Sequence, residues 1–474
     1  MLKKLLTHSF LYSLAPQVPK IASLVLLPII TQHLTAEDYG IYGIITSYLF
    51  ISSALKDLGF SVIFVNTFFK FPHRWKFIWR MLHGHLILWN LVFIIILFAL
   101  LLIAVPQSAM HNFWWIALLT IVPVIVFDNT NLIGNYYFRF SQKPAYIAFS
   151  SGIAAVVSVA ATYYCIVELQ LGYMSWFITS FVSTFVMFLL FVYPVYGRLK
   201  LIPIIKWRRR FITPHLKVAL PMIPHNYSSF LLNSSDRIVM DIYKIDIGKV
   251  GSYNIAYQFG SYFESVAEAI GMAVGPFYSK LYTSKRSNAE YDARALTFFL
   301  MGSFVLGAFL LSLWMKEIFY LLIRNDELKD AYGIGIIILM SYAARPMYFN
   351  SGIKLSLNEK TGVLWRITFV AGLINLALNL IFVPYYGINA AAVITFLSLL
   401  YMSFAGYFFK AYRQGDSAKF YPIAWIVLLF IFTTVAILLR DANFIIKTIL
   451  SVGLLCASTY ILLKNFKRLQ AIDI

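Results

Sequence analysis

Apolar segments long enough to cross a bilayer follow one another along almost the whole of this chain. A hydrocarbon core about 30 Å thick needs roughly 20 apolar residues in each helical crossing. Hydrophobic residues make up 60% of the chain and charged residues only 12%, which excludes a soluble globular protein. We therefore predict an all-α polytopic membrane protein.

Hydropathy places about fourteen crossings in the sequence. They cover residues 10–34, 41–68, 81–105, 112–138, 146–167, 172–196, 216–242, 250–279, 295–321, 331–354, 361–383, 388–409, 421–439 and 443–463. Of the 39 Lys and Arg residues, 28 lie in connections of one parity and five in connections of the other. Because Lys and Arg stay on the cytoplasmic side during insertion, both termini are predicted to be cytoplasmic. An even number of crossings, such as fourteen, is then required.

The net charge of +19 does not indicate a nucleic-acid-binding protein. The positive charges lie in short connections beside apolar segments, where orientation and contact with anionic lipid headgroups explain them. The two cysteines, Cys165 and Cys456, lie inside predicted crossings and offer neither a disulfide framework nor a metal site. No G-x-x-x-x-G-K-[ST] sequence occurs, so ATP hydrolysis by that route is not expected. We predict no catalytic residue and no metal site.

Weak internal matches indicate that the chain is duplicated. Pro16-Gln17-Val18-Pro19 in the first crossing is echoed by Pro221-Met222-Ile223-Pro224 in the seventh, and Gly40-Ile41-Tyr42 in the second by Gly251-Ser252-Tyr253 in the eighth. The order and parity of the matches predict two six-helix units with the same orientation. Parallel repeats in transporters are related by an axis along the membrane normal, with the substrate path between the halves.

This duplication defines the expected domains. We predict an N-lobe over 1–196, a basic cytoplasmic linker over 197–215, a C-lobe over 216–410, and two extra helices with a cytoplasmic tail over 411–474. The two lobes are expected to surround a central cavity.

Cationic residues inside crossings are the first candidate site residues. Insertion scales put the cost of such a residue at about 2.5–3.5 kcal/mol, so it usually faces a bundle interior or a water-filled cavity. Lys20 and His225 each follow one of the two Pro-x-x-Pro sequences, where proline bends the helix. The candidate substrate-binding or cavity residues are Lys20, Lys56, Arg345, His225, Arg237 and Asn233. By contrast, Lys316 and Lys447 lie near the periplasmic ends of crossings and are expected to reach the headgroups.

Acidic residues inside crossings are candidates for ion coupling or charge pairing. These are Asp57, Asp128, Asp236, Glu264 and Glu268. Glu264 and Glu268 are one helical turn apart and share a face with Tyr253 and Tyr257, which predicts a cavity wall. The repeat places Asp128 opposite Arg345, either as an inter-lobe ion pair or as a ligand and a proton site. Asp236 and Arg237 have a second interpretation, which is that they only brace the seventh crossing.

Three stretches carry a family resemblance. They are LVLLPIITQHLTAEDYGIYG (24–43), NSSDRIVM (233–240) and NLALNLIFVPYYGINAAAVIT (375–395). They resemble the polysaccharide-transporter branch of the multidrug/oligosaccharidyl-lipid/polysaccharide (MOP) exporter superfamily, above all the Wzx-type O-antigen flippases.

The resemblance implies a function in lipopolysaccharide or related polysaccharide biosynthesis. It implies two six-helix lobes in the bacterial inner membrane that move an undecaprenyl-pyrophosphate-linked oligosaccharide from the cytoplasmic to the periplasmic leaflet. It also implies coupling to H⁺ or Na⁺, no other cofactor, and contact with polymerase or chain-length proteins of the glycan pathway.

Three alternatives remain open at this point. A small-molecule antiporter of the same superfamily usually carries an organic cation, which the central bases Lys20, Lys56 and Arg345 argue against. A membrane-embedded glycan-processing enzyme needs a catalytic loop or domain outside the membrane, and the connections here are short. A peptidoglycan-precursor flippase is expected to have several arginines in its first two crossings, and this chain has none there.

The orientation is testable with single cysteines introduced after replacement of Cys165 and Cys456. Cysteines at Thr35 and Gln107 should react with a membrane-impermeant thiol reagent added to intact cells with a permeabilised outer membrane. Cysteines at His73 and Ser287 should react only after lysis. One inverted result among these four would refute the assigned orientation.

Overall fold

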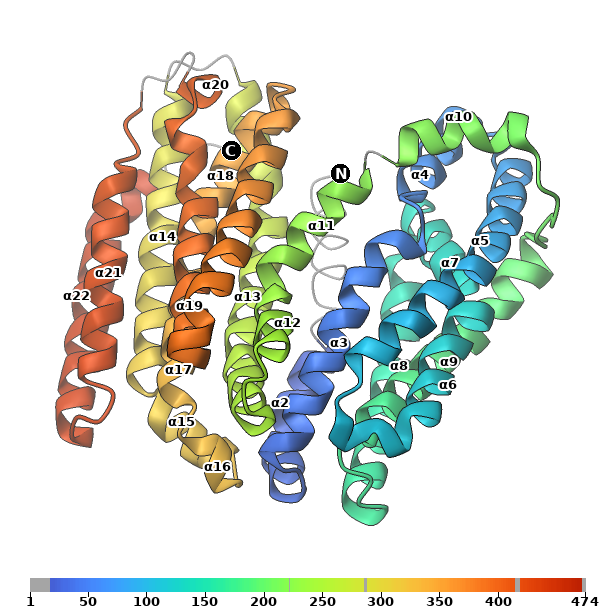
Figure 1. Cartoon of the computed structure of the whole chain (residues 1–474). Helices are drawn as coiled ribbons and strands as arrows, with labels where there is room; N and C mark the ends of the chain where they lie inside the picture. The colour runs from blue at the N-terminus through green and yellow to red at the C-terminus, as the bar shows by residue number, and fades with distance from the viewer. Residues whose placement is uncertain (1–17, 221, 285–287, 414–417, 471–474) are drawn as a thin grey trace. The chain divides into compact units, whose positions relative to one another are not determined.

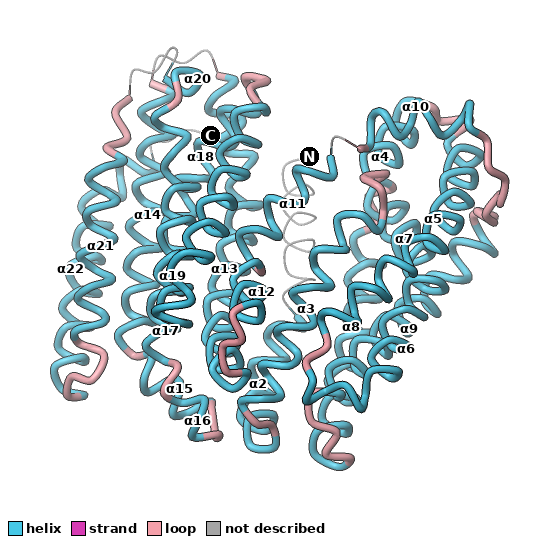
Figure 2. The backbone as a smooth tube through the Cα atoms, viewed as in Figure 1, coloured by secondary structure: helices cyan, strands magenta, loops and turns pink. Residues whose placement is uncertain are grey.

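A computed structural model describes residues 18–220, 222–284, 288–413 and 418–470. The described residues form helices and connecting loops without any strand, as Figure 2 shows, which confirms the all-α prediction. The chain divides into two compact units, Met1–Gly251 and Ser252–Ile474, here called unit 1 and unit 2.

Unit 1 contains the helices coloured blue to green in Figure 1. They are α2 (Val18–His33), α3 (Ala36–Lys56), α4 (Ser61–Lys70), α5 (Trp75–Ala104), η2 (Gln107–Asn112), α6 (Phe113–Val122), η3 (Pro123–Phe127), α7 (Asp128–Phe140), α8 (Pro144–Tyr163), η4 (Tyr164–Glu168), α9 (Met174–Val192), η5 (Tyr193–Arg198), α10 (Arg209–Ala219), α11 (Met222–Asn233) and α12 (Ser235–Ile242). Helix α10 packs on α4, and α11 and α12 pack on α3. The segment predicted as an inter-lobe linker, 197–215, therefore contains the first part of α10, while the predicted lobe boundaries stay a prediction.

The second predicted crossing, 41–68, is not one continuous helix. Helix α3 ends at Lys56 and α4 begins at Ser61, and between them Leu58 (φ 50°) and Gly59 (φ 69°) adopt the left-handed conformation. The Gly59 amide donates a hydrogen bond to Asp57 Oδ1 at 3.1 Å, which stabilises the turn. Hydropathy alone missed this break because the segments 41–55 and 60–68 on either side of it are mainly apolar.

Helix α13 (Ile247–Thr283) begins in unit 1, and its first turns touch α3 through two glycines. A Cβ atom on Gly40 would lie 2.0 Å from the Ile247 carbonyl oxygen, and a Cβ atom on Gly251 would lie 1.8 Å from the Ala36 carbonyl oxygen. The same offset of 211 residues relates Ala36 to Ile247 and Gly40 to Gly251. The contact is thus reciprocal, as it is at a two-fold axis. This geometry supports the duplication inferred from the sequence.

Unit 2 contains the rest of α13 and the helices coloured yellow to red in Figure 1. They are α14 (Ala289–Leu313), α15 (Met315–Leu322), α16 (Asp326–Lys329), α17 (Tyr332–Ser341), η6 (Tyr342–Ala344), α18 (Arg345–Leu357), α19 (Thr361–Phe404), η7 (Ala405–Phe408), α20 (Lys410–Arg413), α21 (Pro422–Leu438) and α22 (Phe444–Gln470). Helices α21 and α22, the two extra crossings of the prediction, both pack against α14.

Among the described residues, six helical stretches are long and apolar enough to cross a membrane by length and composition. Two predicted crossings, 361–383 and 388–409, fall together in the helical run that begins with α19. This run is kinked at Gly387, whose φ of 59° and ψ of −141° only glycine adopts easily. Multiple membrane crossings are therefore confirmed, whereas the count of fourteen stays a prediction.

The expectation that Lys447 reaches the headgroups is wrong, because its side chain is buried against a carboxylate of unit 2, whereas the expectation for Lys316 stays a prediction. Lys447 is buried, with its Nζ 2.7 Å from Glu317 Oε1. Lys316 Nζ lies 2.6 Å from Asp441 Oδ1, and Tyr332 also donates a hydrogen bond to that carboxylate. These donors, Lys316 first, lower the pKa of Asp441 to about 2. Sequence position alone could not reveal these partners, which are more than a hundred residues away along the chain.

The reciprocal glycine contact predicts opposite outcomes for two kinds of glycine substitution. Gly40→Ala or Gly251→Ala should destabilise the protein by roughly 1–3 kcal/mol, because backbone atoms cannot yield to the new methyl group. Gly152→Ala in α8 meets no atom within 4 Å and should be neutral or stabilising, because alanine favours a helix. Thermal unfolding of the purified proteins in detergent measures the difference. Equal midpoints for all three variants would contradict the close approach.

Candidate functional site

One ion pair lies inside unit 1, between the last residue of α3 and the first residue of α7. The Lys56 ammonium contacts the Asp128 carboxylate. The Lys56 side chain is 38% exposed and that of Asp128 16% exposed. Lys56 reaches this position because α3 ends there, and Asp128 directly follows the wide helical turn η3, which Pro123 opens. Lys56 and Asp128, both predicted as site residues, therefore pair with each other, and the sequence did not predict this pairing.

A cavity of about 240 Å³ lies beside this ion pair, wholly within unit 1. Its polar lining, apart from the pair, consists of the hydroxyl groups of Tyr42, Thr46, Ser52, Ser53, Thr120, Ser180 and Thr184. Thr46, Ser52, Ser53, Thr120 and Thr184 each donate a hydrogen bond to a carbonyl of their own helix. Because these hydroxyl protons are engaged, the oxygens are left as acceptors. The cavity can thus hold water or a small cation, and it is too small for an oligosaccharide.

A second ion pair lies inside unit 2, between α13 and the start of α18. The Arg345 guanidinium contacts the Glu264 carboxylate, and both side chains are largely buried, with 14% and 17% exposed. The guanidinium also lies 5.3 Å from the centre of the Tyr342 ring, and the Tyr342 hydroxyl donates to the Tyr257 hydroxyl at 3.2 Å. Arg345 Nε is buried and has no hydrogen-bond partner among the described residues.

The two ion pairs lie on corresponding crossings of the predicted repeat, with opposite signs. In unit 1 the second predicted crossing supplies the base Lys56 and the fourth supplies the acid Asp128. In unit 2 the eighth crossing supplies the acid Glu264 and the tenth supplies the base Arg345. The inter-lobe pairing expected for Asp128 and Arg345 is therefore corrected, because each has its partner within its own unit. A buried charge is stabilised best by the nearest opposite charge, and a repeat offset does not reveal which charge that is.

Four further candidates have local structural contacts. Asp57 closes the turn after α3. Asp236 and Arg237 are buried and paired at 3.3 Å, and Arg237 Nη1 also donates to the Asn233 carbonyl at 2.9 Å. These contacts join the end of α11 to α12, which agrees with the bracing interpretation for Asp236, Arg237 and Asn233.

The remaining candidates fall partly outside what the structure describes. The side chains of Lys20 and His225 lie outside the described residues, so their roles stay predictions. Glu268 is exposed on α13 and close enough to Arg345 to act on it electrostatically. The expected cavity wall on α13 needs a correction, because Tyr253 and Tyr257 are buried inside unit 2. That Arg345 lines a central cavity stays a prediction.

Sequence reasoning did not include Lys354, the last residue of the predicted crossing 331–354, among the candidate site residues, although it is a buried cation. Its side chain is 5% exposed, and Nζ lies 3.0 Å from Glu290 Oε1. The Tyr412 ring centre lies 4.6 Å from Nζ and the Tyr282 ring centre 5.5 Å. The available signal was the spacing of Asn350 and Lys354, which places two polar residues on one face of a helix.

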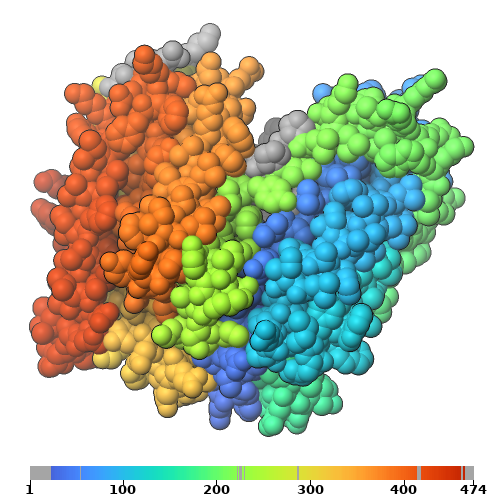
Figure 3. Space-filling model, viewed as in Figure 1, coloured from blue at the N-terminus to red at the C-terminus, as the bar shows by residue number. Residues whose placement is uncertain are grey.

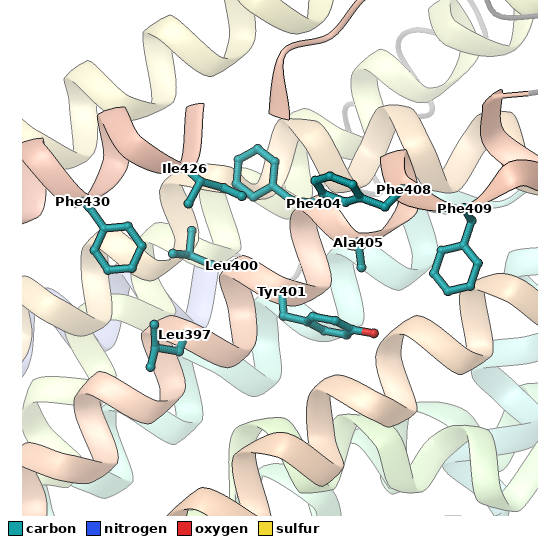
Figure 4. Close-up of a pocket in the computed structure, with 9 residues that line it drawn as sticks. All are labelled: Leu397, Leu400, Tyr401, Phe404, Ala405, Phe408, Phe409, Ile426 and Phe430. Atoms are coloured by element: carbon teal, nitrogen blue, oxygen red, sulfur yellow. The ribbon is translucent and has the colours of Figure 1, made fainter. Parts of the chain in front are cut away.

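An apolar pocket of about 440 Å³ in unit 2 carries no charge (Figure 4). Aromatic and aliphatic side chains of α19, η7 and α21 line it: Leu397, Leu400, Tyr401, Phe404, Ala405, Phe408, Phe409, Ile426 and Phe430. It offers no group that recognises an anion, so the two ion pairs remain the candidate site.

Two family models match the chain. The model described as polysaccharide biosynthesis protein matches residues 5–282, more than half of the chain, and a MatE model matches residues 221–381. No curated protein sequence gives a significant match. The chain belongs to the polysaccharide biosynthesis protein family of the MOP superfamily, as the resemblance predicted.

Solved structures share the fold at low sequence identity. The lipid II flippase MurJ in an inward closed conformation has a TM-score of 0.69 and 15% identity, covering 96% of this chain and 99% of that chain. An outward-facing multidrug resistance MATE family transporter of the MOP superfamily has a TM-score of 0.56 and 14% identity, covering 90% and 96%. A mutant of the Vibrio cholerae MATE transporter VcmN has a TM-score of 0.54 and 14% identity, covering 87% and 96%. The family and the shared fold are those of transporters and flippases, not of enzymes, as expected.

The ion pair in unit 2 predicts thermodynamic coupling between its members. Arg345→Ala and Glu264→Ala should each destabilise the protein, since each leaves one largely buried charge without its partner. The double variant should recover part of the summed loss, with a coupling energy of roughly 0.5–3 kcal/mol. Thermal unfolding of the four proteins completes the cycle. Strict additivity would show that the contact contributes nothing.

Proposed function

We propose that this protein is a flippase for an undecaprenyl-pyrophosphate-linked oligosaccharide, such as an O-antigen or related surface-glycan repeat unit. It carries its cargo by alternating access from the cytoplasmic to the periplasmic leaflet of the bacterial inner membrane, with both termini in the cytoplasm. The family match and the fold shared with a lipid II flippase support a lipid-linked cargo.

The largely buried position of the Arg345 guanidinium is the observation on which this proposal rests. A pyrophosphate headgroup must lose part of its hydration to cross, and guanidinium groups offset that cost with charge-assisted hydrogen bonds. Arg345 is held by Glu264 while its Nε donor has no partner among the described residues. The Arg345 guanidinium can therefore release the Glu264 carboxylate and bind a phosphate group in its place. A small-cation carrier has no need of such a group.

The cavity and the ion pair of unit 1 are the basis for proposing ion coupling. Its acceptor-lined cavity ends on the Asp128 carboxylate, which Lys56 neutralises. A proton or Na⁺ entering the cavity would compete with Lys56 for Asp128, and this competition would link the ion to the conformation of α3 and α7. We propose H⁺ or Na⁺ as the coupling ion, and polymerase or chain-length proteins of the glycan pathway as partners.

An antiporter for small molecules is the second candidate function. The match of the MatE model over residues 221–381 and the MATE structures with the same fold favour it. The two functions differ in their phenotype, because loss of an antiporter changes drug sensitivity without removing a surface glycan.

A complementation experiment tests the proposed function. Deleting the gene in its own host should abolish surface glycan, and the wild-type gene should restore it. Arg345→Ala should fail to restore the glycan at normal membrane levels of the protein. Arg345→Lys should restore it only partly, because the bidentate fork is lost. Gel electrophoresis of the extracted glycan measures the outcome.

Arg366→Ala is the matched control, since it removes an exposed arginine of unit 2 and should restore the glycan fully. Normal glycan in the deletion strain would refute the flippase, and altered drug sensitivity there would favour the antiporter. Normal export by Arg345→Ala would reduce Arg345 to a structural role.

A further inference from the structure

Three connections of unit 1 contain Lys and Arg residues but no Asp or Glu. Residues 70–80, 139–143 and 198–217 hold thirteen Lys and Arg residues. No Asp or Glu occurs in 61–127 or 129–167, nor from Leu169 to Ser235. These connections therefore contain no internal counter-charge.

Side-chain contacts show that the three connections lie together. The Trp75 ring stacks on Tyr137 of α7 with centroids 6.0 Å apart, and Lys143 Nζ lies 5.9 Å from the centre of the same Tyr137 ring, which joins the first connection to the second. Arg80 Nε donates to the Ile202 carbonyl at 2.8 Å, which joins the first to the third. By the predicted orientation, this end of unit 1 faces the cytoplasm.

The loop that precedes α10 holds this helix in place at this end of unit 1. The Ile204 amide donates to the Arg80 carbonyl at 3.0 Å. A Cβ atom on Gly84 would lie 2.0 Å from the Ile204 carbonyl oxygen, so only glycine allows this approach. Ile212 and Ala219 of α10 are buried in the core beneath it. The helix is thus anchored on one face and free on the other.

The free face of α10 forms a shallow depression of about 540 Å³ lined by Arg209, Arg210, Thr213, Pro214 and Lys217. Trp207 and Ile205 stand beside it, 62% and 61% exposed. Figure 3 shows the green α10 segment at the molecular surface. A basic face flanked by an exposed tryptophan is typical of a helix at the level of lipid headgroups.

Membrane orientation alone does not require this composition. Lys and Arg set orientation while acidic residues contribute little, so acids are tolerated in cytoplasmic connections. The corresponding connections of unit 2 contain Glu290, Asp292 and Glu359 among their basic residues. The absence of acids from the connections 70–80, 139–143 and 198–217 of unit 1 therefore points to an anionic ligand.

We propose that the free face of α10 docks the diphosphate headgroup of the lipid-linked cargo in the cytoplasmic leaflet, before translocation. Arg209, Arg210 and Lys217 neutralise the diphosphate, and the Thr213 hydroxyl donates a hydrogen bond to it. The Trp207 and Ile205 side chains insert between the lipid chains. This insertion favours a diphosphate carried by a membrane lipid over a soluble diphosphate. The inference rests on the proposed function and deepens it.

Lipid retention by the purified, full-length protein tests the docking site. Radiolabelled undecaprenyl pyrophosphate, without sugar, is the probe, and the protein is held in phosphatidylcholine nanodiscs. Arg209→Gln/Arg210→Gln/Lys217→Gln should weaken retention at least about tenfold. The charge-preserving variant Arg209→Lys/Arg210→Lys/Lys217→Arg should recover most of it. Lys280→Gln/Lys360→Gln/Arg366→Gln removes three exposed cations of unit 2 and should change retention less than about twofold.

Competition assigns the ligand. Unlabelled undecaprenyl pyrophosphate should displace the probe, whereas phosphatidylglycerol and inorganic pyrophosphate at the same concentration should not. Equal competition by phosphatidylglycerol would overturn the proposal in favour of a membrane anchor, and equal competition by pyrophosphate would overturn the choice of a lipid. Unchanged retention by the glutamine variant would also overturn it. Because retention needs neither transport nor glycan, its failure is distinct from failure of the flippase function.

Discussion

The close approach of α3 and the start of α13 is a backbone contact that depends on a glycine in each helix. Gly40 and Gly251 each meet a backbone carbonyl of the other helix, so no side chain separates the two at that level. Roughly four turns further along, α3 presents Lys56 and α13 presents Glu264. Each of these residues then pairs within its own unit. The two helices that meet at these glycines therefore each supply one member of an ion pair.

The reversed signs of the two ion pairs divide the functional chemistry between the units. In unit 1 a flexible ammonium covers a carboxylate beside a small cavity lined by acceptor oxygens, an arrangement suited to exchange of a small cation. In unit 2 a carboxylate holds a guanidinium, whose planar fork suits phosphate. Each ion pair lies inside a single unit, the first in unit 1 and the second in unit 2. A ligand that displaces one member of a pair therefore acts on the helices of the unit that contains the pair.

The two units also differ in how they use their basic residues. The connections 70–80, 139–143 and 198–217 of unit 1 contain Lys and Arg but no acid, whereas unit 2 buries Lys354 against Glu290 beneath two tyrosine rings. Hydropathy and charge counting predicted the basic connections, because both are properties of composition. They could not separate Lys354 from its exposed neighbours, since burial depends on Tyr412 and Glu290, which are distant in sequence. The same limitation explains Lys447 and its partner Glu317.

Composition and the order of apolar segments alone determined that this protein is helical and crosses the membrane repeatedly, because a bilayer imposes segment length and charge distribution directly on the sequence. The family resemblance likewise depended on contiguous stretches of sequence. Only the tertiary structure decided that Asp128 pairs with Lys56 rather than Arg345, that Tyr253 and Tyr257 are buried, and that α3 ends at Lys56. The physical reason is that electrostatic pairing and packing depend on distances between residues far apart in the chain, and hydropathy contains no information about those distances.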